Sequence, residues 1–412
     1  MPSMLRLPLA SALALAACSG DESGPTSDTA ASVSTTASTT ASTDTDTDNT
    51  TTTDGTATTD ASGTASATGT TTTTTTGEST SGTTSDGTTT TTTGDTDTTT
   101  GGGVPGALCD PIPSCDAPPP KLDNTPTPDD DNHRGRDMFY VDGEDQWVLA
   151  KFADGGILDL DYHGYTVHIF LLRGCEGDWE KLGTAVTSDD GDNPTVEGVE
   201  DTGGRIYFKI PEDKRLAPGR HRIHMIVEDD KSAVDQYIDV VPMGAPIFLS
   251  DVDGTLTTSE NEEFYDLLLG TIPDMNPFAN QAFQLLASKG YRPMYLTARP
   301  EFLYKRTREF LTLHDFPHGI VHTTLSKTGA LGSEAAAFKS GELQMLADKG
   351  LVPIYVFGNT ESDAEAYNNG GIQPLDHRIF FQFNDAVYGG RTINSYGDLL
   401  DEFDELPDLC DP

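Results

Sequence analysis

The feature that most limits the possible folds of this chain is a short apolar run that ends in two acids. Residues 247–249 are Ile, Phe and Leu, and Asp251 and Asp253 follow, with Gly254 and Thr255 next in the chain. An apolar run of this length without alternation is typical of a parallel strand that is buried on both faces. Both carboxylates would then lie at the carboxyl end of the strand, the edge where open α/β sheets bind their ligands. We therefore expect a parallel α/β domain with an acidic site at this edge.

Strands alternate with helices from Met243 onward, which predicts a mostly parallel sheet with helices on both faces. The further strands are expected at residues 292–296, 320–322, 353–357 and 378–382. Asn276 as N-cap and Pro277 as first residue should begin the helix after the first strand, and Gly290 should end it. One face of this helix carries its apolar residues Ala279, Ala282, Phe283 and Leu286. Thr297 directly follows an expected strand, so it should lie near the two acids.

The polar residues of this region fit a site for phosphoryl transfer. A phosphate ester resists attack because its oxygens repel an incoming anion, so a catalyst needs a positioned nucleophile and nearby cations. The acidic segment 251–255, residues 295–299, the pair 338–339 and residues 358–363 with Tyr367 resemble the motifs of the haloacid dehalogenase (HAD) superfamily. Within that superfamily they are most similar to the lipin-type (LNS2) branch of phosphatidate phosphatases.

This resemblance implies a HAD-like Rossmannoid α/β domain over residues 243–412, and the short spacing between motifs leaves no room for a large cap. It further implies that Asp251 attacks phosphorus and forms an aspartyl-phosphate, and that Asp253 protonates the leaving group and then activates water. Thr297 and Lys339 would contact the phosphoryl oxygens. The other substrate-binding candidates are Gly254, Thr255, Ala298 and Arg299.

The same resemblance implies a Mg²⁺ ion, which prefers oxygen ligands in octahedral geometry. Its protein ligands would be Asp251, the backbone carbonyl of Asp253, and Asp363 or Asn359. A calcium loop of the EF-hand type is an alternative for the acidic segment, with Glu262 at its twelfth position. Leu256, however, stands where that loop requires glycine, which argues against calcium.

Two assignments leave alternatives open. Asp363 lies three residues after Thr360, which also fits a helix N-cap with an acidic partner in the first turn and needs no metal. Lys327 competes with Lys339 for the role of the phosphate-binding lysine, and the Phe338-Lys339 context matches the lipin branch better.

Three functions are compatible with these motifs. The first is hydrolysis of a lipid phosphate monoester such as phosphatidate, the second is hydrolysis of soluble or polymer-linked phosphates, and the third is a non-catalytic binding role at a surface. Related LNS2 domains of phosphatidylinositol-transfer proteins lack the complete acidic motif and bind lipid rather than hydrolyse it. Asp251 and Asp253 are both present here, which favours catalysis.

Residues 137–242 show the alternation of a β-sandwich. Apolar residues alternate with polar ones near residues 167–171, 206–210 and 223–227, and turn signals such as Pro218-Gly219 separate these runs. We expect an antiparallel, immunoglobulin-like sandwich of about seven strands ahead of the α/β domain.

The N-terminal part predicts export and a long linker. Residues 1–18 combine Arg6, an apolar core and small residues before Cys18, which resembles the lipobox of a bacterial lipoprotein signal peptide. Residues 19–136 are rich in Thr, Ser, Gly and Pro and should form a disordered linker. The mature protein would thus be lipid-anchored in a bacterial cell envelope, at the outer membrane or cell surface. A net charge of −41 without a Lys/Arg cluster argues against nucleic acid as a partner.

Four further cysteines, Cys109, Cys115, Cys175 and Cys410, allow three disulfide pairings in an oxidising compartment. We favour Cys109 with Cys115 and Cys175 with Cys410, in a structural role.

Overall fold

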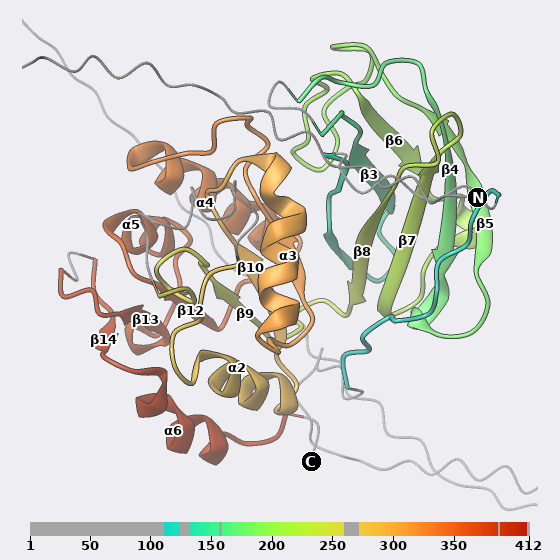
Figure 1. The fold of residues 1–412 in the computed structure, drawn as a ribbon. Helices are drawn as coiled ribbons and strands as arrows, with labels where there is room; N and C mark the ends of the chain where they lie inside the picture. The colour runs from blue at the N-terminus through green and yellow to red at the C-terminus, as the bar shows by residue number, and fades with distance from the viewer. Residues whose placement is uncertain (1–110, 124–131, 156–158, 259–271, 386–387, 410–412) are drawn as a thin grey trace, which may run out of the picture. The chain divides into compact units, whose positions relative to one another are not determined.

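The computed structural model describes residues 111–123, 132–155, 159–258, 272–385 and 388–409. The expected signal peptide with Cys18, most of the expected linker, Glu262, Cys109 and Cys410 lie outside these residues. Within the described ranges, no helix is long and apolar enough to cross a membrane. The described residues form two domains that belong to one compact unit (Figure 1).

The C-terminal domain is built on a six-stranded sheet in which every paired strand is parallel. Its strands are β9 (Ile247–Ser250), β10 (Arg292–Leu296), β11 (Ile320–His322), β12 (Tyr355–Gly358), β13 (Arg378–Phe381) and β14 (Arg391–Ile393). The spatial order is β11-β10-β9-β12-β13-β14, which is the doubly wound order. In this order the strand sequence reverses between β9 and β12, so a ligand site is expected where these two strands end.

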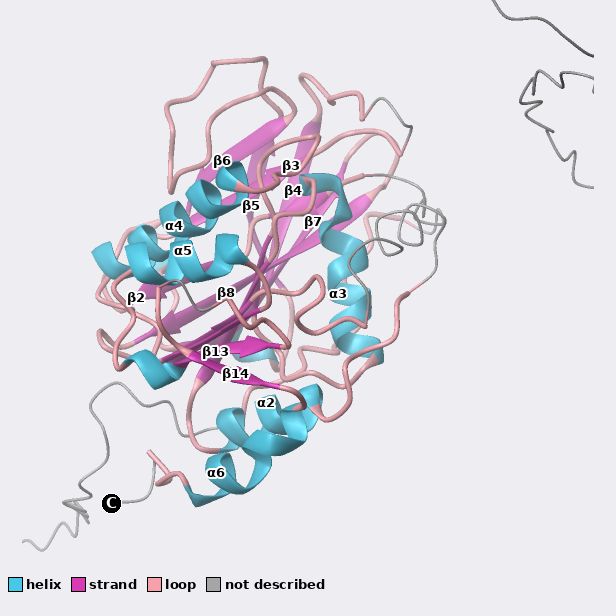
Figure 2. Cartoon of the chain, turned by 90° about the vertical axis from the view of Figure 1, so that its left-hand side faces the viewer, coloured by secondary structure: helices cyan, strands magenta, loops and turns pink. Residues whose placement is uncertain are grey.

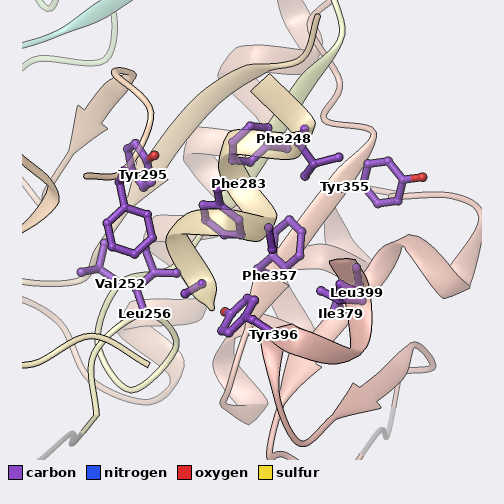
Figure 3. Close-up of a cluster of buried hydrophobic side chains, with 14 of the residues drawn as sticks. Phe248, Val252, Leu256, Phe283, Tyr295, Tyr355, Phe357, Ile379, Tyr396 and Leu399 are labelled. Atoms are coloured by element: carbon purple, nitrogen blue, oxygen red, sulfur yellow. The ribbon is translucent and has the colours of Figure 1, made fainter. Parts of the chain in front are cut away.

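Helices cover both faces of this sheet, as the alternating sequence pattern predicts. They are α2 (Ala279–Ser288), α3 (Tyr304–Leu313), α4 (Ser333–Asp348), α5 (Glu361–Asn369) and α6 (Leu400–Glu405). Figure 2 shows α4 and α5 side by side, with α2 and α6 together elsewhere on the domain. Alternate residues of β9 enter two cores: Phe248 packs with Phe283 and Phe357 (Figure 3), whereas Leu249 packs with Val356 and Leu343.

The helix after the first strand begins later than the sequence predicts. Helix α2 starts at Ala279, and Phe278 precedes it with a left-handed φ of 69°, so Asn276 is not its N-cap. The Asn276 amide instead donates hydrogen bonds of 2.9 Å each to the carbonyl oxygens of Thr255 and Thr257. Its side chain therefore stabilises the loop that follows the acidic segment, where carbonyl groups would otherwise be buried without donors.

The N-terminal domain is a β-sandwich. Its strands are β1 (Arg134–Gly135), β2 (Met138–Val141), β3 (Trp147–Lys151), β4 (Thr166–Leu172), β5 (Glu180–Val186), β6 (Arg205–Lys209), β7 (Gly219–Val227) and β8 (Ala233–Val241). They form a three-stranded sheet of order β1-β3-β6 and a five-stranded sheet of order β2-β8-β7-β4-β5. Strands β2 and β8 pair in parallel, so the expectation of a purely antiparallel sandwich is wrong at this edge. Alternation within one strand cannot reveal the direction of its neighbour.

Part of the expected linker is placed against the sandwich. Cys115 forms a disulfide with Cys175, which corrects both pairings favoured from the sequence. Arg222 also donates to the carbonyl oxygens of Cys115 and Ala117, at 2.8 and 3.2 Å. A disulfide and an arginine therefore join the segment 111–123 to the sandwich.

Candidate active site

The two acids of the motif lie at the carboxyl end of β9, beside the point where the strand order reverses. Asp251 is 3% exposed, and its backbone N–H donates to the Phe357 carbonyl oxygen of β12 at 2.9 Å. Gly254 has a φ of 69°, a conformation that glycine adopts without strain, and it turns the chain just after Asp253. The turn returns Thr255 to Asp251, and its hydroxyl lies 2.9 Å from Oδ2 of that carboxylate.

Helix α4 brings Lys339 into contact with two carboxylates. Its ammonium group donates to Oδ1 of Asp251 at 2.6 Å and to Oδ1 of Asp363 at 2.5 Å. Lys327, the competing candidate, is instead half exposed and donates to the backbone oxygen of Asp159 in the sandwich at 2.7 Å. The structure therefore brings Lys339 and not Lys327 to the two acids.

The electrostatics of this group are dominated by burial. Burial is the main effect that raises the pKa of Asp251 to about 7; the Lys339 charge opposes this rise, and the nearby Asp363 and Asp253 add to it. Burial alone would lower the pKa of the Lys339 ammonium, but the two carboxylates hold that pKa above its ordinary value. Lys339 therefore stays charged between two acids that repel each other.

Asp253 is held by the loop that follows β10. Thr297 donates from its hydroxyl to Oδ2 of Asp253 at 2.6 Å, and Arg299 donates from Nε to Oδ1 at 2.7 Å. Thr297 is fully buried, whereas the side chain of Asp253 is 31% exposed. Ala298 contributes to this loop through its backbone: its carbonyl oxygen accepts a hydrogen bond from the N–H of Ala330 at 2.9 Å. Asp253 is thus fixed on one side and open to solvent on the other.

The loop after β12 supplies Asn359 and Asp363. The Thr255 hydroxyl lies 2.9 Å from Oδ1 of Asn359, so one hydroxyl contacts both Asp251 and Asn359. Asp363 forms a capping box with Thr360 at the start of α5, which agrees with the capping alternative. The same carboxylate also reaches Lys339 through its other oxygen, so capping and site membership coexist.

Glycine is required where β12 ends. A Cβ at Gly358 would lie 2.5 Å from the Cβ of Asp363, so a larger residue would displace that carboxylate. Tyr367 adds a hydrogen bond of 2.5 Å from its hydroxyl to the Phe357 carbonyl oxygen. In the sequence, this arrangement is indicated by Gly358 at the end of the expected strand and by the capping pair Thr360 and Asp363 that follows it.

The donors at this site have the chemistry that Mg²⁺ prefers. Asp251, Asp363 and Asn359 offer carboxylate and amide oxygens that are linked to one another through Lys339 and Thr255. Among the described residues, no three His, Cys, Asp or Glu side chains are grouped to hold a metal. At this site the Asp253 carboxylate accepts hydrogen bonds from Thr297 and Arg299.

Two family models match the chain, one over each domain. Residues 131–240 match the model of the β-sandwich domain of PITM 1-3, and residues 248–381 match that of the LNS2 domain of PITM 1-3. The folded region is therefore a PITM-type β-sandwich followed by an LNS2 domain with the HAD-like strand order. The α/β fold, the preceding β-sandwich and the LNS2 resemblance predicted from the sequence are confirmed, and the matching models are those of PITM 1-3.

Curated relatives match over a small part of their own length. Protein retinal degeneration B of Drosophila melanogaster is 27% identical over 267 residues, which cover 65% of this chain and 19% of that protein. Membrane-associated phosphatidylinositol transfer protein 2 of Homo sapiens is 25% identical over 245 residues, which cover 59% of this chain and 16% of that protein. The chain thus spans about a fifth or less of these relatives.

Solved structures resemble the chain only distantly. A putative β-phosphoglucomutase from Thermotoga maritima has a TM-score of 0.29 and 16% identity, covering 39% of this chain and 99% of that chain. A phospho-aspartyl intermediate analogue of phosphoserine phosphatase has a TM-score of 0.27 and 13% identity, covering 38% of this chain and 98% of that chain. The fold of this chain is instead defined by its strand order and by the two family models.

Proposed function

We propose that this protein is a Mg²⁺-dependent phosphomonoester hydrolase that acts through an aspartyl-phosphate on Asp251. The observation that carries the proposal is the buried contact of Lys339 with Asp251 and Asp363, at 2.6 and 2.5 Å. A purely structural lysine is rarely buried, because desolvation of its charge is costly. A lysine that neutralises phosphoryl oxygens beside a nucleophile would offset this desolvation cost by its role in catalysis.

In the proposed reaction Asp251 attacks phosphorus, and the bond from phosphorus to the ester oxygen breaks. Asp253, in its protonated form, donates its proton to the departing alkoxide. Asp253 then accepts a proton from the water that attacks the aspartyl-phosphate, which releases inorganic phosphate and restores the Asp251 carboxylate. Thr297 and Arg299 orient Asp253 for both transfers, because they contact its two oxygens.

The metal would be held by Asp251, the carbonyl of Asp253, Asn359 and Asp363, with water completing its shell. When bound, it would neutralise charge on the phosphoryl oxygens and so lower the repulsion toward Asp251. Lys339 supplies a fixed positive charge on the same side.

The proposed substrate is a lipid phosphate such as phosphatidate. The support is the LNS2 match over residues 248–381, the names of the relatives, which describe membrane-associated phosphatidylinositol transfer proteins, and the short sequence between the acidic segment and Thr297. A site without a large cap must take its remote binding energy from the surface that presents the substrate.

Phosphate release from phosphatidate in mixed micelles, glycerol phosphate, sugar phosphates and nucleotides, each with Mg²⁺ or EDTA, tests the proposal. We expect Mg²⁺-dependent release and the highest kcat/KM for phosphatidate. Asp253→Asn should lose about 10²- to 10⁴-fold in turnover. A higher kcat/KM for a soluble ester would reject the lipid substrate and retain the hydrolase, and absence of release from every ester would favour a binding role.

The proposed location is a membrane surface, where Cys18 would carry the lipid anchor. The support is the lipobox-like segment and the Thr-rich sequence after it. The full chain should partition into detergent, and Cys18→Ser should move it to the aqueous phase; equal partitioning of both would reject the anchor.

A further inference from the structure

The sandwich contacts the catalytic domain at the same sheet edge that carries the site. We propose that the sandwich positions the catalytic groups, through two buried arginine–glutamate contacts, Arg136 with Glu342 and Arg205 with Glu301. This inference rests on the proposed hydrolase function of the site. It assigns the sandwich a role in catalysis beyond that of a spacer.

The first contact fixes the helix that carries Lys339. Glu342 lies three residues after Lys339 on α4, so both side chains project from nearly the same face of the helix. Arg136 donates from Nη2 to Oε1 of Glu342 at 2.5 Å, and from Nη1 to the carbonyl oxygen of Thr323 at 3.0 Å. One arginine of the sandwich therefore binds both α4 and the loop that leaves β11.

A histidine completes this contact. His322, the last residue of β11, lies with Nδ1 2.6 Å from Oε2 of Glu342, and its Nε2 donates to the carbonyl oxygen of Asp137 in the sandwich at 2.5 Å. Arg136, His322 and Glu342 are each at most 7% exposed. Burial would raise the pKa of Glu342, but Arg136 and His322 lower it to about 2, so the carboxylate is charged.

The second contact fixes the loop that holds Asp253. Glu301 lies two residues after Arg299, and Arg205 donates from its two terminal nitrogens to both oxygens of Glu301, at 2.9 and 3.0 Å. Arg134 donates to the same carboxylate at 3.2 Å. The Glu301 N–H also donates to the carbonyl oxygen of Ser326 at 2.9 Å, which links this loop to the one after β11.

Buried ion pairs of this kind are better suited to fixing geometry than to adding stability. Desolvation of both charges offsets most of their attraction, so apolar residues of similar volume would stabilise the interface at least as well. The bidentate contact of Arg205 restricts Glu301 in distance and in angle, and the two nitrogens of Arg136 restrict Glu342 relative to the Thr323 carbonyl oxygen. A displacement of about 1 Å at a catalytic group can cost about 100-fold in rate. Restricting the elements that carry Lys339 and Asp253 would therefore protect the rate of the proposed reaction.

The interface also contains a matched control at the opposite edge of the sheet. Arg220 is 4% exposed, pairs with Asp239 within the sandwich at 2.9 Å, and donates to the carbonyl oxygen of Gly319 at 3.2 Å. Gly319 precedes β11, whereas Thr323 follows it. Arg220 is thus a buried arginine of the same interface that contacts the end of β11 remote from the site.

The test compares R136M, R205M and R220M in the full chain by thermal unfolding and by steady-state kinetics on the substrate that wild type hydrolyses best. We expect all three variants to unfold at lower temperature. R136M and R205M should lose about tenfold or more in kcat with KM within about twofold, because the bound groups are misplaced. R136K, which keeps the charge but lacks the two-nitrogen fork that binds both Glu342 and the Thr323 carbonyl oxygen, should recover only part of the kcat lost in R136M. R220M should keep the wild-type kcat.

Equal kcat values for R136M, R205M and R220M would overturn the inference and leave the sandwich a stabilising domain. If wild type releases no phosphate from any ester, the proposed hydrolase fails, and amide hydrogen exchange then decides the positioning role. In that experiment R136M, but not R220M, should increase exchange in the α4 segment around Lys339. Unchanged exchange in R136M would reject positioning independently of activity.

Discussion

Replacement of Lys339 with methionine should reduce both the activity and the stability of this protein. The ammonium group lies 2.6 Å from Asp251 and 2.5 Å from Asp363. The side chains of Lys339 and Asp251 are each 5% exposed, and that of Asp363 is 0% exposed. Methionine keeps most of the aliphatic stem and removes the charge, so two buried carboxylates are left facing each other.

The size of the effect follows from this geometry. At an effective dielectric constant of about 20, each contact contributes about 6 kcal/mol of attraction before desolvation is subtracted. Removal of one partner from a buried ion pair typically costs about 3–5 kcal/mol of unfolding free energy. Part of that cost is avoidable, because Asp251 has a pKa of about 7 even beside Lys339 and can take up a proton.

The pH dependence has a definite sign. The pKa of Asp251 should rise further in K339M, so its folded-state pKa lies above its unfolded-state pKa. The folded protein then binds more protons than the unfolded chain, and the free energy of unfolding falls as pH rises. The loss relative to wild type should therefore be about 3–5 kcal/mol at pH 8 and smaller at pH 6.

Urea unfolding in EDTA at both pH values, together with phosphate release in Mg²⁺, measures this prediction. Lys327→Met is the matched control, because Lys327 is half exposed and pairs with the sandwich, and such pairs contribute about 0–1 kcal/mol. Unfolding of K339M at the wild-type midpoint would refute the reasoning. Loss of phosphate release in K327M together with its retention in K339M would refute it too.

Four further outcomes can be checked separately. Asp251→Asn should abolish phosphate release while the unfolding free energy changes by less than about 1 kcal/mol, because asparagine keeps the acceptor oxygen and removes a repelling charge. Glu342→Gln should destabilise by about 3 kcal/mol above pH 4.5; a lowered folded-state pKa, here about 2, means that this loss should disappear as pH falls toward 2, and a pH-independent loss would contradict the charged pair with Arg136. A Cys115→Ser, Cys175→Ser double variant should lose about 4 kcal/mol, since the disulfide closes a loop with a sequence separation of 60, and peptide mapping without this cross-link would contradict the pairing. Turnover of phosphatidate in vesicles should depend weakly on added anionic lipid, and a steep rise would point to a basic surface that the composition does not suggest.

The α/β domain was predictable because its signals are local. An apolar run without alternation identifies β9, and parallel strands bring their carboxyl ends to one edge, so the sequence alone groups Asp251, Thr297 and Asn359. The start of α2 was not predictable in this way. Asparagine is a residue type that often caps a helix N-terminus, but the Asn276 amide binds the carbonyl oxygens of Thr255 and Thr257. No local sequence pattern distinguishes a helix-capping asparagine from one that binds a loop.

The interface between the domains left no signal in the sequence. Asp137, Glu301 and Glu342 are charged residues without apolar periodicity, which in most proteins lie at the surface. Asp137 is 0% exposed here and accepts hydrogen bonds from the Tyr304 hydroxyl and the Val321 N–H, at 2.7 and 3.0 Å. Its partners are more than 160 residues away in the chain, so only the tertiary fold could identify them.

The interface also bears on how the site can recognise a phosphate. The chain has 25 Lys and Arg residues against 66 Asp and Glu residues. Seven of the described arginines are at most 7% exposed, and four of these, Arg134, Arg136, Arg205 and Arg220, pair with carboxylates between or within the domains. Cations that are buried in ion pairs cannot attract an anionic surface from solution, and the acidic excess repels it. For the proposed hydrolase, attraction for a phosphate would then arise within the site, from Lys339 and the proposed metal. Such short-range recognition selects the phosphoryl group itself and leaves the rest of the substrate to be selected by the surface on which it is presented.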